Sequence, residues 1–375
     1  MALNTIPNPG LTKRGFPTVR VAKPLIINGD MAVAQRATSK TGVTNGNFGI
    51  WTCDRINFTE SGTMSAVLTI TQESLTSGDA YTDGFSNAYK IDVTTADSSL
   101  AADDFYRTNY RIEGQDLQIF KKGTANAEKF TLAFWVKATK TGTNIVELND
   151  NDNGRHCCAS YTISSSDTWE KKVLNFAADT TGAWDNDNAE SLRINFILGA
   201  GSNYTSGTLA TSWASNTTAN IAVGQVNNFD STSNNVHITG VQLEVGEFNS
   251  TTLPAFTFES YGDNLLRCQR YYQEGNNVDG GSSIISGGSG LGFIAVNAGE
   301  AFGSNQWVVQ MRATPTVTLY NNAGTSAGAH HMGTGDITGV AGGRITNTAW
   351  NTITKSSGFT DGDYYMCNYK ATAEL

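Results

Sequence analysis

Charged side chains are scarce in this sequence. Lys, Arg, Asp and Glu make up 16% of the 375 residues, so Ser, Thr, Asn and Gly must cover much of the surface. Helical bundles need more Ala, Leu, Glu and Lys than this, and the composition argues against them. The 39 glycines instead suit many short strands joined by turns.

Excess positive charge and long apolar runs are also lacking. The net charge of −9 disfavours nucleic acid as the main partner. No apolar run approaches the length of a membrane span, and the N-terminus has no apolar core like that of a signal peptide. We therefore expect no membrane insertion.

The five cysteines are odd in number, scattered, and without a CxxC pair. This pattern argues against a disulfide framework or a zinc site and favours reduced, buried thiols. His156, Cys157 and Cys158 are adjacent, but neighbouring strand residues point to opposite faces, so these three side chains should not converge.

Catalytic signatures are missing as well. There is no GxSxG or HExxH motif, and none of the 34 acidic residues is singled out as half of a catalytic pair. We expect no enzyme activity and no organic cofactor.

What the sequence does contain is alternation of apolar and polar residues. Residues 25–248 read as a long series of strands separated by Gly, Asn, Asp and Ser turns, which indicates a β-sandwich or barrel. The predicted strands are 64–70, 89–93, 106–112, 130–136, 145–148, 157–163, 169–176, 192–198 and 236–246.

Residues 249–273 read as a linker and a short helix. Leu265, Cys268, Gln269 and Tyr272 have helical spacing, and polar residues before them can cap the helix. Residues 274–375 predict a second, small Gly-rich β-sandwich with strands at 291–297, 306–312, 316–320 and 364–370.

Residues 1–24 hold four of the six prolines and several basic side chains. Proline at this density favours extended chain. We interpret this segment as an anchoring arm that lies along an acidic partner, rather than as a free tail, with the anchoring candidates Lys13, Arg14, Arg20 and Lys23.

Several stretches resemble a family of structural proteins from tailed viruses of marine bacteria. They are LIINGDMAVAQRATS (25–39), TCDRINF (52–58), ITGVQLEVGE with FESYGDNLLRCQRYYQ (238–273), and MRATPTVTLYN (311–321). Such proteins are described as tail-fibre or receptor-binding components. The resemblance implies a jelly roll like that of carbohydrate-binding modules, with its first and last strands, 25–34 and 236–246, side by side.

The resemblance also implies a homotrimer, and the thin second domain favours assembly. The helix region is then where three chains would meet. The trimer-contact candidates are Leu265, Leu266 and Tyr272, and Arg267 and Arg270 could pair across subunits.

Sugar binding needs aromatic faces open for stacking, with amides and carboxylates nearby for the hydroxyl groups. Trp184, Tyr204 and Trp213 lie in polar, turn-rich stretches and are the glycan-binding candidates. The alternative is that each of them closes the end of a sandwich core, as most tryptophans do. Trp135 and Trp169 lie within strand patterns and should pack.

Two acidic loops, 148–155 and 184–190, alternate Asp and Asn and could bind Ca²⁺. Turn formation by the same residues is the alternative that we favour. The His330–His331 pair lies in a Gly-rich loop and could contact a partner or a metal, although a solvated loop explains it equally simply. The sequence thus neither predicts nor excludes a metal site.

The sequence predicts a virion protein on the tail or capsid surface. It would attach a phage to host-surface polysaccharide through a non-catalytic sandwich, and contact other virion proteins through residues 1–24. The alternatives are a capsid decoration or head fibre, an architectural tail component without glycan binding, and a polysaccharide depolymerase.

Overall fold

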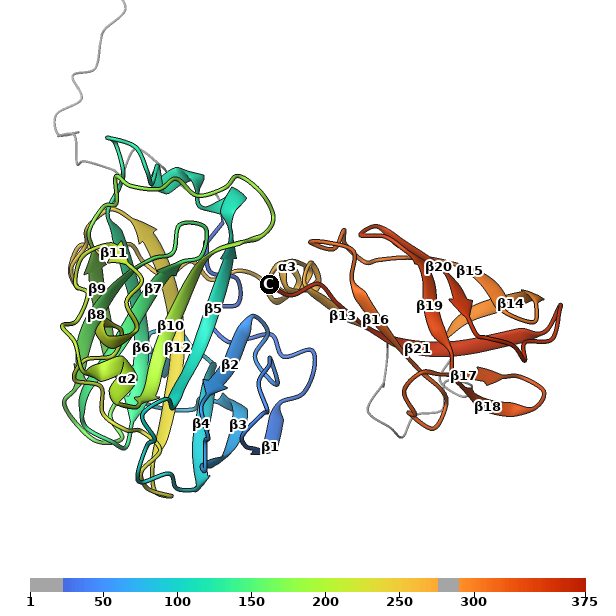
Figure 1. The fold of residues 1–375 in the computed structure, drawn as a ribbon, viewed down its shortest axis with the longest axis horizontal. Helices are drawn as coiled ribbons and strands as arrows, with labels where there is room; N and C mark the ends of the chain where they lie inside the picture. Colours follow the sequence, from blue (N-terminus) through green and yellow to red (C-terminus); the bar gives the residue numbers. More distant parts are fainter. Residues whose placement is uncertain (1–22, 276–289) are drawn as a thin grey trace, which may run out of the picture.

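The structure, a computed structural model, describes residues 23–275 and 290–375. Figure 1 shows a larger and a smaller β body, with the helix α3 (Tyr261–Gln269) between them. Of the anchoring candidates, Lys13, Arg14 and Arg20 lie outside the described residues. Lys23 has its Nζ 4.0 Å from Glu259 Oε1. No helix within the two described ranges is both long enough and apolar enough to cross a bilayer.

Two six-stranded antiparallel sheets form the larger body. The first has the order β1 (Ser39–Val43), β3 (Val67–Ser74), β4 (Asn87–Thr95), β12 (Asn235–Val245), β6 (Phe130–Ala138) and β9 (Glu170–Phe176). The second has the order β11 (Ala214–Ser215), β8 (Arg155–Ile163), β7 (Gly142–Asp150), β10 (Glu190–Ala200), β5 (Phe105–Glu113) and β2 (Ile56–Ser61). The predicted all-β class is confirmed.

Helical turns are short and lie between the strands. They are α1 (Asp79–Thr82), α2 (Ser202–Thr205) and the 3₁₀ turns η1 (Gly114–Asp116), η2 (Gln118–Phe120) and η3 (Thr218–Asn220).

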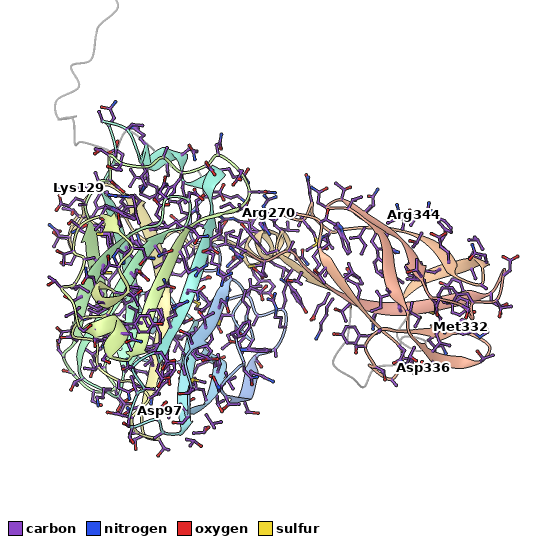
Figure 2. The ribbon with its side chains drawn as sticks, viewed as in Figure 1. Asp97, Lys129, Arg270, Met332, Asp336 and Arg344 are labelled. Carbon is purple, nitrogen blue, oxygen red and sulfur yellow. The ribbon has the colours of Figure 1, made fainter. Side chains whose placement is uncertain are left out.

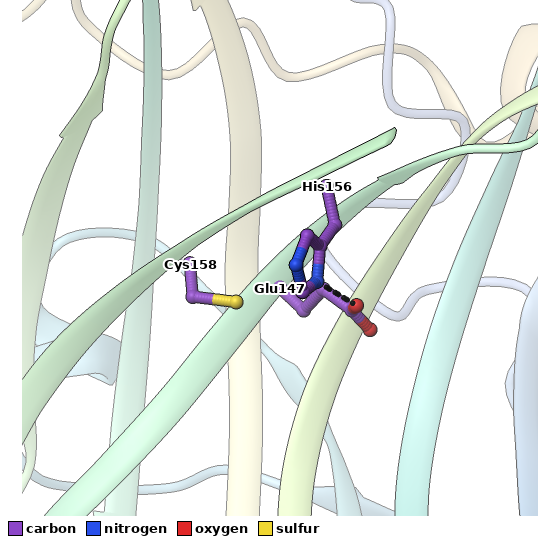
Figure 3. A group of neighbouring side chains, drawn as sticks. All are labelled: Glu147, His156 and Cys158. Carbon is purple, nitrogen blue, oxygen red and sulfur yellow. Dashed lines mark hydrogen bonds and ion pairs between the residues drawn. The ribbon is translucent and has the colours of Figure 1, made fainter. Parts of the chain in front are cut away.

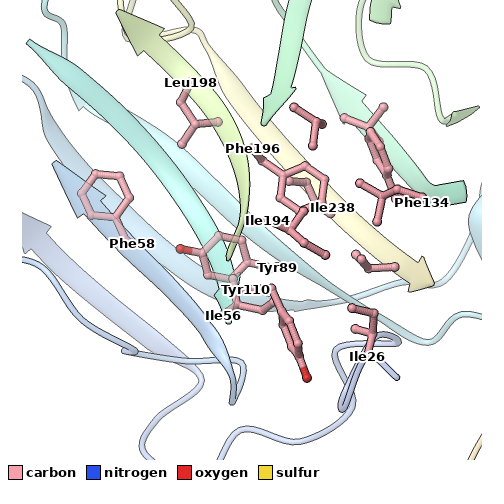
Figure 4. Packing of buried hydrophobic residues seen from close by; sticks show 14 of the residues in the cluster. Ile26, Ile56, Phe58, Tyr89, Tyr110, Phe134, Ile194, Phe196, Leu198 and Ile238 are labelled. Carbon is pink, nitrogen blue, oxygen red and sulfur yellow. The ribbon is translucent and has the colours of Figure 1, made fainter. Parts of the chain in front are cut away.

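The core of the larger body lies between its two sheets. Alternate residues of β10 and β6 point into it, so that Phe196 and Phe134 meet with ring centroids 5.0 Å apart. Figure 4 shows this packing, with Ile238 of β12 in the same cluster. The period-2 pattern therefore predicted the buried face of these strands correctly. Trp135 and Trp169 pack in a second, smaller apolar cluster on the other side of the first sheet.

The predicted strand at 25–34 is wrong. Asn28 and Met31 have φ values of 60° and 58°, which belong to the left-handed region and cannot continue a strand. The Asn28 side chain donates to the carbonyl oxygens of Val33 and Asp54 and accepts from Val33 N, which fixes a turn. This turn still lies beside β12, because Val241 N donates to Gly29 O over 2.9 Å.

The smaller body is a curled antiparallel sheet. Its order is β18 (Gly335–Thr338), β17 (Gly328–His331), β21 (Tyr364–Thr372), β14 (Leu291–Asn297), β15 (Glu300–Gln306), β20 (Ala349–Thr354) and β19 (Ala341–Ile345). β13 (Tyr272–Glu274) and β16 (Thr316–Tyr320) also pair with β21. Its core contains Phe293, Trp350 and Tyr365.

The predicted strand at 306–312 is also wrong. Here β15 ends at Gln306, and the next residues bond outside any ladder: Val308 N donates to Gln273 Oε1 and Met311 N to Asn347 O. Trp307 and Met311 are nevertheless buried. The apolar alternation therefore predicted burial without a strand.

The helix α3 begins where the cap pattern predicts, because Ser260 Oγ accepts from Asp263 N. Cys268 and Tyr271 belong to the core of the larger body, so α3 packs with that body rather than beginning the smaller one. β13 follows α3 directly and pairs with β21. The two bodies are thus joined by almost no free chain.

The proposed trimer contacts are largely occupied within one chain. Tyr272 is 4% exposed and stacks with the Arg36 guanidinium 3.7 Å from its ring centroid. Leu265 packs against the core, whereas Leu266 is 44% exposed. Arg267 pairs with Glu259 and Arg270 with Glu113, so the pairing of these arginines across subunits was a wrong expectation.

Candidate functional site

Trp184 does not present an open aromatic face. Its side chain is 5% exposed, and its ring meets the Phe130 ring edge-on with centroids 5.7 Å apart. Phe120 packs against the same ring. The expectation that Trp184 stacks on a sugar is therefore corrected, because its side chain is buried among the rings of Phe120 and Phe130.

Tyr204 and Trp213 are each half-buried, and they lie apart. Tyr204 stacks on Phe105 with centroids 4.3 Å apart. Trp213 donates its indole N–H to Ala177 O over 2.8 Å and leans against Phe130. The three candidates thus do not form one platform, since Trp184 and Trp213 share Phe130 while Tyr204 packs on a different cluster.

A buried lysine contacts Asp150 of the acidic loop 148–155, one of the two loops that could have held Ca²⁺. Lys122 Nζ is 2.6 Å from Asp150 Oδ2 and 3.1 Å from Asp179 Oδ2, and none of the three charged groups is more than 4% exposed. The ammonium also donates to the carbonyl oxygens of Thr181 and Gly182. The cation in this oxygen cage is an ammonium from the chain itself, which satisfies the carboxylates without a metal.

One group in the described part of the chain has the residue types for a transition metal: Glu147, His156 and Cys158, whose ligand atoms all lie within 4.8 Å of one another (Figure 3). Cys157 points into the core on the other side of β8, as strand geometry predicts. The prediction missed Glu147, which β7 places directly opposite Cys158.

These three side chains are already joined by hydrogen bonds. His156 Nδ1 lies 3.0 Å from Glu147 Oε1, and Asn195 Nδ2 donates to Glu147 Oε2 over 2.8 Å. Burial raises the pKa of the Cys158 thiol, so the thiolate that a metal would need is disfavoured. The group is therefore a buried polar cluster in which Glu147 and His156 already have hydrogen-bond partners within the protein.

The His330–His331 pair lies in the strand β17, not in a loop. His330 Nδ1 contacts Asp336 and His331 Nε2 contacts Asp363, at 2.6 and 2.8 Å. Each imidazole thus has its own carboxylate partner, and the two do not converge.

A cleft with a volume of about 820 Å³ lies between the two bodies. The larger body contributes β1, the loop 48–51 and the start of β2, and the smaller body contributes β16 and the end of β21. Its aromatic, amide and basic lining residues include Lys40, Phe48, Trp51, Asn57, Arg111, Tyr320 and Lys370. We call this space the inter-body cleft.

Aromatic rings are prominent in the lining of the inter-body cleft. Phe48 is 62% exposed, and Trp51 is half-buried. Gly49 precedes Trp51 by two residues, and a Cβ there would make ordinary van der Waals contact with the Trp51 ring at 3.5 Å. Trp51 Nε1 is shielded from solvent and has no hydrogen-bond partner in the structure as described. Tyr320 stands on the opposite wall.

Amide groups continue from the cleft across the outer face of the second sheet. Asn57, Asn109 and Asn195 lie side by side on β2, β5 and β10. Asn57 Oδ1 and Asn195 Oδ1 are both shielded and lack partners within residues 23–275 and 290–375. Buried polar atoms of this kind are costly unless something bonds to them.

Sequence reasoning missed Trp51 and Phe48. The signal was present, since NGNFGIW (45–51) is as rich in turn residues as the stretches around Trp184 and Trp213. What the sequence could not show is the second wall, which comes from residues more than 250 positions later.

No family model and no curated protein matches this sequence. A bacteriophage CBA120 structure, described as the enzymatically active domain of tailspike protein 4, is similar with a TM-score of 0.30 and 13% identity over 59% of this chain. The match spans 21% of the tailspike chain.

Two bacterial structures are similar to the same degree. A putative sugar-binding protein from Bacteroides thetaiotaomicron has a TM-score of 0.30 and 16% identity, over 60% of this chain and 100% of that one. The family 11 carbohydrate-binding module of a Clostridium thermocellum cellulase has a TM-score of 0.27 and 11% identity, over 56% and 97%. Since these TM-scores are low, we base the proposed function on the geometry of the cleft.

Proposed function

We propose that this chain is a non-catalytic, saccharide-binding structural protein, a tail fibre or similar appendage of a tailed bacterial virus. The observation that carries the saccharide part is the inter-body cleft, which Phe48, Trp51 and Tyr320 line together with polar side chains such as Asn57. Its volume falls within the range of roughly 300–1,000 Å³ typical of small-ligand clefts.

The chemistry of the lining fits a sugar. The C–H face of a pyranose can stack on an aromatic ring such as Trp51, while the side-chain amide of Asn57, which lines the cleft, can bond to hydroxyl groups. Thr318 and Thr372 add hydroxyl groups from the smaller body. Such a site binds by contact alone, and no covalent step is required.

The viral part of the proposal is supported by the sequence resemblance, which covers nearly all of the chain from residue 25 onward. Assembly as a homotrimer would multiply weak saccharide contacts through avidity. Light scattering of the purified protein would give the mass of three chains if this is correct, and the mass of one chain would contradict it.

The experiment that tests saccharide binding compares two tryptophan variants. Trp51→Ala should weaken binding to soluble oligosaccharides at least tenfold in calorimetry, which corresponds to about 1.4 kcal/mol. Trp213→Ala is the matched control, because Trp213 is also half-buried in the larger body but does not line the cleft.

Two results would contradict the proposal. Loss of binding in Trp213→Ala with full binding in Trp51→Ala would place the site elsewhere. New reducing ends after incubation with polysaccharide would overturn the non-catalytic assignment.

A further inference from the structure

Basic side chains are concentrated at the inter-body cleft, although the whole chain carries a net charge of −9. Five basic residues and one carboxylate line the cleft: Arg36, Lys40, Arg55, Arg111, Lys370 and Glu374. Lys40 Nζ lies 5.0 Å from the centre of the Trp51 ring and has no carboxylate partner among residues 23–275 and 290–375. A cation thus lies over the Trp51 ring within the cleft.

Two arginines face each other across neighbouring strands at the edge of the cleft. Arg111 of β5 and Arg193 of β10 are direct register partners, an arrangement in which like charges destabilise a sheet. Glu190 is the carboxylate that they share, at 3.5 Å from Arg111 and 2.6 Å from Arg193. One carboxylate therefore serves two guanidinium groups.

The electrostatic cost shows in the titration of Arg111. The pKa of Arg111 is lowered, and burial is the largest cause. The carboxylate of Glu190 opposes this shift, whereas the positive charges of Arg193 and Arg55 add to it. Its Nε donates to Asn109 Oδ1 and its Nη1 to Leu375 O, while Nη2 has no hydrogen-bond partner in the described ranges. Glu190 is thus the one acidic side chain within ion-pair distance of Arg111 among residues 23–275 and 290–375.

The cleft already holds one carboxylate of the chain itself. Glu374 is bound by Arg36 at 3.0 Å and by Arg55. Each guanidinium is fixed by an aromatic ring, Arg36 over Tyr272 at 3.7 Å and Arg55 over Tyr271 at 3.5 Å. Preorganised arginines of this kind suit the planar geometry of a carboxylate.

We infer that the ligand of the inter-body cleft is an anionic saccharide, whose carboxylate or sulfate binds Arg111 and Lys40 while its ring stacks on Trp51. This inference rests on the proposed function and specifies its ligand class. Glu374 and Glu190 are the acidic groups that a bound anion must approach, and both are already paired with arginine.

The test uses three probes of equal length: an oligogalacturonate, a sulfated galactan oligosaccharide and a neutral β-glucan oligosaccharide. Calorimetry with the full chain should show at least tenfold tighter binding of one or both acidic probes. Raising NaCl from 50 to 300 mM should weaken only the acidic probes, because charge contacts are screened. The acidic probe that binds more tightly identifies whether the anionic group of the ligand is a carboxylate or a sulfate.

Arg111→Gln should weaken acidic binding at least fivefold and leave neutral binding unchanged. Lys40→Gln gives the same readout from a partly exposed side chain outside the core, so the test survives if Arg111→Gln does not fold. Arg344→Gln is the matched control, since Arg344 lies on the smaller body (Figure 2) and does not line the cleft, and its side chain is 62% exposed.

Equal binding of neutral and acidic probes, with no loss in Arg111→Gln or Lys40→Gln, would overturn this inference and leave the proposed function standing. Absence of binding to all three probes would overturn both.

Discussion

At the scale of single residues, exposure separates two tryptophans that look alike in sequence. Trp184 and Trp51 both follow turn-rich stretches, yet the Trp184 ring is enclosed by Phe120 and Phe130, whereas Trp51 lines the cleft. The sequence pattern predicts that an aromatic residue lies near a turn. It does not predict whether the ring is enclosed in the core or lines a cleft, since that depends on non-local packing.

Trp184→Ala should therefore act on stability rather than on binding. Removing a large aromatic side chain from a packed core costs about 3–5 kcal/mol. Thermal unfolding should show a clear drop in melting temperature, while the saccharide affinity of the remaining folded protein stays at the wild-type level. An unchanged melting temperature would show that the ring is not part of the core.

Asp54 should give the protein a pH-dependent stability. Burial raises its pKa to about 6, although Arg36 and Gln35 counteract the shift and Glu374 adds to it. In the unfolded chain an aspartate titrates near 4. Between these two values the folded state holds a proton that the unfolded state has released, so stability falls as the pH rises from about 4 to about 6.

The measurement is denaturant unfolding of the wild type and Asp54→Asn at pH 4.5 and pH 7. The wild type should gain stability relative to the variant at the lower pH, with a full effect of about 3 kcal/mol across the window. An equal difference at the two pH values would contradict the raised pKa.

At the scale of elements, period-2 patterning predicted most strands of the larger body and their buried faces. It failed at 306–312, and the strand that the family resemblance implied at 25–34 is also absent, because the backbone hydrogen bonds of both segments go to partners outside a strand ladder. Asn28 N bonds to Asn264 Oδ1, and Met311 N bonds to Asn347 O. Local patterns contain no information about such partners. The helix α3 was predictable because its cap and spacing are local.

The junction between the bodies depends on Arg312. Its guanidinium donates to Asn188 O at 2.7 Å, to Ala373 O at 2.7 Å and to Glu374 O at 3.1 Å. It thereby ties the larger body to the strand end that leaves β21. These contacts link the two bodies that form the walls of the inter-body cleft.

Arg312→Ala should loosen this junction without unfolding either body. Small-angle scattering should show a larger radius of gyration, and saccharide affinity should fall because Tyr320 and Lys370 move away from Trp51. Arg344→Ala is the control for the loss of a surface arginine. An unchanged radius of gyration in Arg312→Ala would show that other contacts suffice to hold the bodies together.

At the scale of the whole molecule, the proposed site exists only because two β bodies meet. The all-β architecture and the helix between the bodies were predictable, but the cleft was not. Its walls come from residues 36–57 and 318–375, with Arg111 and Tyr272 between them. Figure 1 shows the two bodies on either side of α3, the arrangement that brings these segments together.

The central claim, that a saccharide stacks on Trp51, can be tested most directly by ¹⁹F NMR. The chain labelled with 5-fluorotryptophan has seven signals, which single Trp→Phe substitutions assign. Titration with the tightest oligosaccharide should shift the Trp51 signal and leave those of buried Trp184 and Trp350 in place. Binding that leaves the Trp51 signal unmoved, or that shifts Trp213 instead, would contradict the account.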